Sequence, residues 1–97
     1  MSEYVIKSGD REAVIAGLRE LAQFLADNPE VLVPPWPSFV LVVSAVDNAA
    51  RREGADFAAR PLDVQVEDLG EGFYSAARAF GPVSYRVAAV PPREDRT

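Results

Sequence analysis

The strongest hydrophobic pattern in the chain runs from Arg11 to Ala26, where apolar residues recur at intervals of three and four. They are Val14, Ile15, Leu18, Leu21, Ala22 and Leu25. This spacing predicts an amphipathic helix. Asp10 is placed to cap its first turn, and Pro29 ends it because the residue before a proline avoids the helical conformation. Phe24 lies off the stripe, either as a rim residue or as a small contact point.

Residues 72–90, GFYSAARAFGPVSYRVAAV, alternate in a way that predicts a β-hairpin around Gly81-Pro82. A two-residue turn of type II′ takes glycine at its first central position, where φ is positive, and proline suits the second. This turn pairs Arg78 with Tyr85 across the hairpin. One face then carries Tyr74, Ala76, Phe80, Val83, Tyr85, Val87 and Ala89. We expect that face to pack on helices, and a slip of one residue would exchange the two faces.

The middle of the chain gives three shorter patterns. Residues 39–44, FVLVVS, are a continuous apolar run typical of a strand buried on both faces. A second helix is expected from Ser44 or Asp47 to about Ala59. Residues 62–67 alternate and predict a half-exposed strand. The inner face expected for the second helix is Val46, Ala49 or Ala50, Phe57 and Ala58, with Arg51, Arg52 and Glu53 in solvent.

Two segments remain outside these elements at the N-terminal side. Residues 2–7 form either a short strand or a mobile arm. Residues 29–37, PEVLVPPWP, hold four of the eight prolines and predict an extended connector. Its Val31, Val33 and Trp36 would cover the edge of the core. Pro34 and Pro37 also fit a PxxP docking ligand, although no basic residue flanks them.

The 97 residues are enough for one domain. We expect an α+β domain over residues 1–90, in the order helix, strand, helix, strand, strand, strand, and a disordered tail at 91–97. The sheet would have three or four mainly antiparallel strands, with both helices on one face in a two-layer arrangement. A strand–helix–strand unit could instead set residues 39–44 and 62–67 parallel.

Composition narrows the possible chemistry. The net charge of −5 argues against non-specific nucleic-acid binding, which depends on neutralising phosphates. The chain has no cysteine and no histidine, so it lacks thiolate zinc ligands, a thiol nucleophile and the commonest general base. No signal peptide and no apolar run of about 20 residues is visible. We therefore expect a cytoplasmic protein that binds no membrane, carries no cofactor or metal, and is not an enzyme.

Several side chains are candidates for binding. Arg78 beside Tyr85 is either an edge arginine with its stem on apolar surface or, like Arg86, a holder of an anion. Carboxylates cluster from residue 63 to residue 71, as a solvated face, a contact surface for a basic partner or a weak site for a hard cation. These carboxylates are Asp63, Glu67, Asp68 and Glu71.

Two stretches, GLRELAQFLADNPEVLVPPW (17–36) and GFYSAARAFGPVSYRV (72–87), resemble small proteins common in actinobacteria and their phages. Those proteins carry a helix like LRELAxFL, a proline-containing connector and a later FY…FGxVxxxV pattern. The resemblance covers about half of the chain and brings no established activity. It implies a non-catalytic accessory protein and is compatible with a phage or mobile-element origin.

Three functions are consistent with these observations. The first is a protein-binding or regulatory module, which would bind a partner or a second copy through an exposed sheet face or edge. Trp36 and the acidic residues Glu67, Asp68 and Glu71 would form the rim of that surface. The second is a sensor that holds an anionic ligand with Arg78 or Arg86. An enzyme, the third, would need a deep pocket that converges on carboxylates or Tyr74.

Overall fold

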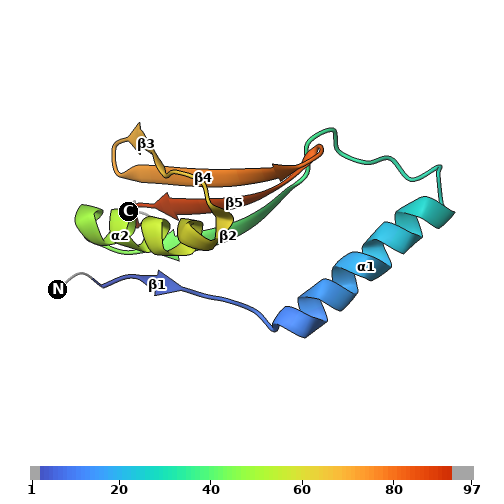
Figure 1. Cartoon of the computed structure of the whole chain (residues 1–97), viewed down its shortest axis with the longest axis horizontal. Coiled ribbons are helices and arrows are strands. Elements are labelled where there is room, and N and C mark those ends of the chain that lie inside the picture. Colours follow the sequence, from blue (N-terminus) through green and yellow to red (C-terminus); the bar gives the residue numbers. More distant parts are fainter. Residues whose placement is uncertain (1–2, 93–97) are drawn as a thin grey trace, which may run out of the picture.

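A computed structural model describes residues 3–92 and shows an α+β fold with a five-stranded mixed sheet (Figure 1). Spatial strand order is β1-β2-β5-β4-β3. Residues 93–97 of the predicted tail and the first two residues of the chain lie outside the described part. The elements are β1 Val5–Ile6, α1 Arg11–Asp27, β2 Ser38–Ser44, α2 Asn48–Ala59, a 3-10 turn Arg60–Leu62, β3 Glu67–Gly70, β4 Phe73–Phe80 and β5 Val83–Val90.

The hairpin predicted at the C-terminal end is confirmed in both turn and register. β4 and β5 are antiparallel, with Arg78 opposite Tyr85. Gly81 has a φ of 65°, which a glycine adopts without the steric cost that a side chain would add. The predicted inner face is also confirmed over most of its length, because Tyr74, Ala76, Val87 and Ala89 are buried. Its last pair, Phe80 and Val83, lies at the hairpin tip and stays exposed.

The rest of the sheet differs from the prediction of three or four mainly antiparallel strands. β2 lies parallel to β5, with Phe39 opposite Tyr85 and Val43 opposite Ala89. The predicted strand at 62–67 is wrong, because the 3-10 turn and the left-handed Asp63 (φ 59°) occupy its first half. Val64 and Val66 are half-buried against the core from a loop, so their alternation did not reflect a strand. The short strand β3 begins only at Glu67 and pairs with β4.

The N-terminal segment forms a strand rather than a mobile arm. β1 pairs antiparallel with β2, with Ile6 opposite Val43. Just before it, the Tyr4 ring lies 6.2 Å from the ring of Phe57 on α2. β1 therefore adds a fifth strand at one edge and helps to seat α2.

α2 packs closely on the sheet through small residues. Ala50, Gly54, Ala55 and Ala59 are its buried positions, together with Arg51. The predicted inner face was wrong at Val46, which is 84% exposed, and at Phe57, which is 54% exposed, but it was right at the buried Ala50 and at Ala58, which packs against the core. A Cβ on Gly54 would come within 2.6 Å of a Val43 methyl. Because the two layers approach this closely, only small side chains fit between them and the larger ones lie at the sides of the helix.

α1 forms where predicted but does not cover the sheet. The Asp10 carboxylate accepts hydrogen bonds from the backbone N–H groups of Glu12 and Ala13 at 3.1 and 3.2 Å, as expected for a cap. The expectation of two helices on one face was wrong, because α1 projects beyond the end of the sheet (Figure 1). Residues 29–37 return as an extended connector without covering the core, since Trp36 is 80% exposed. Only α2 covers the sheet within the described residues.

Candidate interaction surface

α1 presents an apolar stripe that the rest of residues 3–92 covers only in part. None of its 17 residues is buried, and the exposed fractions rise from 36% at Val14 to 53% at Leu21. An isolated helix of this length is only marginally stable in water, and most helices in proteins depend on burial of an apolar face. Full burial of each half-exposed side chain would contribute about 1 kcal/mol. The helix would therefore gain stability from a partner that covers its stripe.

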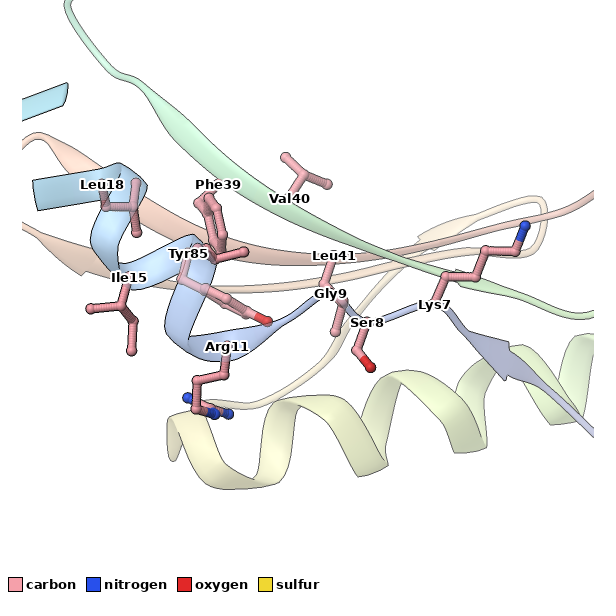
Figure 2. A pocket seen from close by; sticks show the side chains of 11 residues that line it. Lys7, Ser8, Gly9, Arg11, Ile15, Leu18, Phe39, Val40, Leu41 and Tyr85 are labelled. Carbon is pink, nitrogen blue, oxygen red and sulfur yellow. The ribbon is translucent and has the colours of Figure 1, made fainter. Parts of the chain in front are cut away.

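The first two turns of α1 form one wall of a groove of about 340 Å³. Val14, Ile15 and Leu18 line this wall, and the opposite wall comes from the sheet (Figure 2). There the rings of Phe39 and Tyr85 lie 5.6 Å apart at an angle of 49°. A buried cavity of about 150 Å³ holds a benzene molecule, so this groove has room for about two large apolar side chains. We call it the α1 groove.

The two ends of α1 differ in charge. Lys7 and Arg11 line the α1 groove, and no carboxylate does. Asp10 and Glu12 lie beside them in the first turn, so this end carries both signs. The last turn of the helix has no basic residue and contains Asp27, with Glu30 three residues beyond. Exposed carbonyl groups add partial negative charge at this projecting end.

The sheet face opposite α2 is a second uncovered apolar surface. Val43 and Val87 point to α2 and are fully buried, so their neighbours point the other way. On this open face Val40 is 51% and Val42 48% exposed. Parallel strands such as β2 and β5 are usually covered on both sides. Other large side chains of the open face are Val5, Phe73 and Val90, which are 36–57% exposed.

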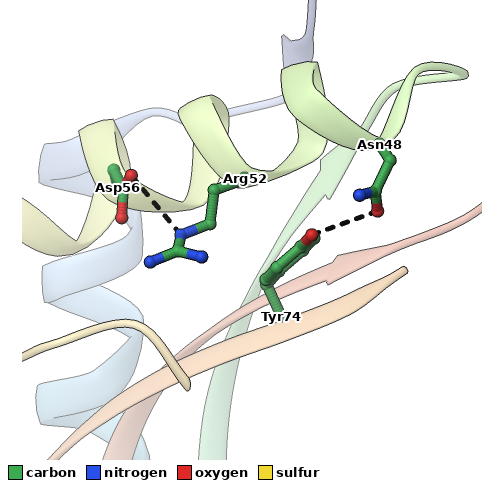
Figure 3. Close-up of polar contacts among 4 residues, drawn as sticks. All are labelled: Asn48, Arg52, Asp56 and Tyr74. Atoms are coloured by element: carbon green, nitrogen blue, oxygen red, sulfur yellow. Dashed lines mark hydrogen bonds and ion pairs between the residues drawn. The ribbon is translucent and has the colours of Figure 1, made fainter. Parts of the chain in front are cut away.

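A polar cluster beneath α2 has a structural role. Arg51 is 6% exposed and donates to the carbonyl oxygens of Ala45, Val46 and Gly72 at 2.8–2.9 Å. The hydroxyl of Tyr74 donates to the Asn48 side-chain oxygen at 3.1 Å (Figure 3). Every buried side-chain nitrogen and oxygen in the described residues has a partner. The cluster therefore ties α2 to two loops and leaves no free group for a ligand.

The arginines proposed from sequence do not form one anion site. Arg78 and Arg86 lie on opposite faces of the sheet. Arg78 pairs with Tyr85 and Arg86 with Ala77, and neighbouring pairs of a hairpin point to opposite faces. One guanidinium nitrogen of Arg78 donates to the Leu62 carbonyl at 3.3 Å. The guanidinium carbon of Arg78 lies 5.6 Å from the centre of the Phe80 ring. Arg86 lies on the open face, where it donates to the hydroxyl of Ser75 at 2.6 Å.

Trp36 and the acidic residues are far apart. Trp36 precedes β2, next to the tip of the β4–β5 hairpin, since the Ser84 N–H donates to the Pro37 carbonyl. Glu67 and Asp68 lie on β3, and Glu71 is in the turn to β4 at the other end of the sheet (Figure 1). In residues 3–92, no three carboxylates are arranged to hold a metal ion. These residues cannot form the rim of one small surface.

Lys7 and Arg11 were not among the sequence candidates, and the α1 stripe was assigned to the core. The acidic C-terminal end of α1, with Asp27 and Glu30 and no basic residue in the last turn, is visible in the sequence. The chain matches no protein-family model, no curated protein and no solved structure. Across residues 3–92, neither helix has the length and hydropathy that a bilayer crossing needs.

Proposed function

We propose that this chain is a non-catalytic, cytoplasmic protein-binding module whose docking element is α1. One observation carries the proposal: a capped, 17-residue amphipathic helix stands off the sheet with its apolar stripe exposed. Helices that bind in this way place residues at spacings of three, four and seven against a partner. Val14, Leu18, Leu21 and Leu25 have this spacing.

The remainder of the fold supports a rigid platform for that helix. The β4–β5 hairpin, β2 and α2 share a core of small and β-branched residues. The α1 groove joins this platform to the helix, so a partner that lies along α1 also reaches the ring of Tyr85. The absence of histidine and cysteine from the chain agrees with a binding role.

The test is site-specific photo-crosslinking in the cells that naturally carry the chain. A photoreactive phenylalanine analogue replaces Leu21 on the stripe, and the matched control replaces Gln23 on the opposite side of the helix. We expect covalent adducts of defined mass from position 21 and few from position 23. Equal labelling at both positions, or no adduct at position 21, would contradict a docking role for α1.

A second candidate function is binding of an amphipathic anion in the α1 groove. The groove is within the usual size range of small-ligand sites, which begins at about 300 Å³, and combines apolar walls with Lys7 and Arg11. A carboxylate with a hydrophobic body matches this lining. Thermal unfolding with a panel of aromatic and aliphatic carboxylates tests the idea. A rise in the melting temperature that disappears in the Arg11→Ala variant is expected, and no rise with any of them refutes it.

A further inference from the structure

The projecting half of α1 and the α1 groove are complementary parts of the same chain. The groove is apolar with cations at its edge, namely Lys7 and Arg11. The projecting half offers exposed Leu21 and Phe24, which are 53% and 52% exposed, and ends in Asp27. A helix with an exposed apolar face therefore matches the groove, and the chain itself has such a segment.

We infer that a second copy of this chain occupies the groove, through an antiparallel pair of α1 helices related by a twofold axis. This inference rests on the proposed function and names the partner of α1. In such a pair the second half of each helix enters the groove of the other copy. A twofold contact uses the same surface on both copies and closes after two subunits, so both projecting halves are covered at once.

Antiparallel pairing also suits the helix dipoles. The carbonyl-bearing end of one helix lies beside Arg11 and the N-terminus of the other, which favours this direction over parallel pairing. Aligning Val14 with Leu25 of the second copy aligns Leu18 with Leu21. The same alignment sets Arg11 opposite Asn28, at the carbonyl end of the partner helix, while Asp27 stays on the polar side of α1 with Gln23.

The contact area sets the strength of the expected dimer. A helix of 17 residues is about 25 Å long and about 10 Å wide. Two such helices, each also touching the Phe39–Tyr85 wall of the other copy, bury on the order of 1,000 Å². This is the lower limit for specific complexes, so we expect a dissociation constant on the order of 10 µM.

The first test is sedimentation of the full chain from about 1 to about 300 µM, a range that brackets the expected constant. The mass should rise from 10.5 kDa towards twice that value. Leu21→Glu/Phe24→Glu should weaken the dimer at least about 30-fold, as loss of central apolar contacts does. Gln23→Glu, on the polar side of α1, should leave it unchanged. Circular dichroism checks that each variant keeps its fold.

Charge reversal tests the direction of pairing. Arg11→Glu should weaken the dimer about 3- to 10-fold, because it sets an acid beside the carbonyl end of the partner helix. The change favours the isolated helix, since it places an acid near the N-terminus. A weaker dimer therefore does not result from loss of α1. If Arg11→Glu leaves the dimer unchanged or tightens it, the antiparallel contact is wrong.

Engineered cysteines give an independent readout, because the chain has none of its own. An equimolar mixture of Val14→Cys and Leu25→Cys chains should form a mixed disulfide on mild oxidation. Either variant alone should not, since its two thiols would be roughly 16 Å apart in an antiparallel pair, far beyond disulfide range. Efficient self-linking of Val14→Cys would indicate parallel helices and overturn the inference.

The outcomes separate this inference from the proposed function. A monomer at the highest concentration, together with a photo-adduct from position 21 to a different protein, removes the second copy and keeps α1 as a docking helix. A monomer with no such adduct removes both.

Discussion

Arg51 and Arg52 are adjacent in the sequence but lie in opposite environments, and substituting each in turn tests the polar cluster beneath α2. Arg51 is 6% exposed, and its guanidinium donates to three backbone carbonyls and to Asn48. Arg52 is a surface residue, with its side chain 48% exposed and 3.7 Å from the Asp56 carboxylate (Figure 3). Sequence reasoning assigned both residues to solvent.

The expected cost of Arg51→Met follows from these contacts. Each hydrogen bond from a charged donor contributes about 1.5–3 kcal/mol, so three short ones contribute roughly 5–9 kcal/mol. Burial of the cation offsets several kcal/mol of this. Methionine retains much of the apolar stem but leaves three carbonyls without a donor. We expect the free energy of unfolding to fall by about 3–4 kcal/mol, out of a total of about 5–15 kcal/mol for a domain.

Urea unfolding followed by far-ultraviolet circular dichroism measures this change. Trp36 is 80% exposed in the folded chain, so its fluorescence reports poorly on the core. With a slope of about 1 kcal/mol per molar urea, the midpoint should fall by roughly 3 M. Arg52→Met is the matched control. It loses a surface ion pair and the position of the guanidinium 5.5 Å from the Tyr74 ring centre, and should cost about 1 kcal/mol.

If Arg51→Met unfolds without denaturant, Arg51→Lys gives a measurable intermediate. Lysine keeps the charge but cannot reach carbonyls on two loops at once, so we expect a loss of about 2 kcal/mol. All samples are compared at one protein concentration, because self-association would otherwise change apparent stability. If Arg51→Met lies within 1 kcal/mol of the parent chain, the cluster does not hold α2 and the reasoning is refuted.

Three further substitutions test the packing of α2 and one hydrogen bond. Gly54→Ala should destabilise the chain by about 1–3 kcal/mol, since its Cβ would lie 2.6 Å from Val43, whereas Gly17→Ala on open helix surface should stabilise by up to about 1 kcal/mol. Equal effects of the two in thermal unfolding would contradict the close approach of α2. Tyr74→Phe should cost about 1 kcal/mol by loss of the hydrogen bond to Asn48, and a neutral result in urea unfolding would show that this bond contributes nothing.

Local chemistry was enough to predict two elements. The β4–β5 register follows from one glycine–proline turn, because a two-residue loop fixes every pair that follows it. The limits of α1 follow from Asp10 and Pro29, which act within one turn of each end. In both cases the residues that decide the structure are neighbours in the sequence.

Contacts between distant segments were not predictable in this way. Nothing in FVLVVS (39–44) specifies that it pairs in parallel with a strand 46 residues later, as Phe39 does with Tyr85. Phe57 was assigned to the inner face of α2 because it is more hydrophobic than Gly54 or Arg51. In the structure α2 lies so close to the sheet that Gly54 fits where a larger side chain would not. Arg51 is buried because its guanidinium donates to three backbone carbonyls. Likewise, the apolar stripe of α1 predicts that this face is buried, but it does not identify the surface that buries it. The α1 groove could only be found once the helix was placed.

β1 and β2 are neighbours in the sheet, although residues 7–37 separate them along the chain. The residues between them, α1 included, form one long connection that leaves the sheet after β1 and returns to it at the neighbouring strand β2. The entropy of closing such a loop grows only with the logarithm of its length, so residues can be gained or lost there at small thermodynamic cost. This architecture allows the helix to diverge in evolution while the strands that carry it remain constant.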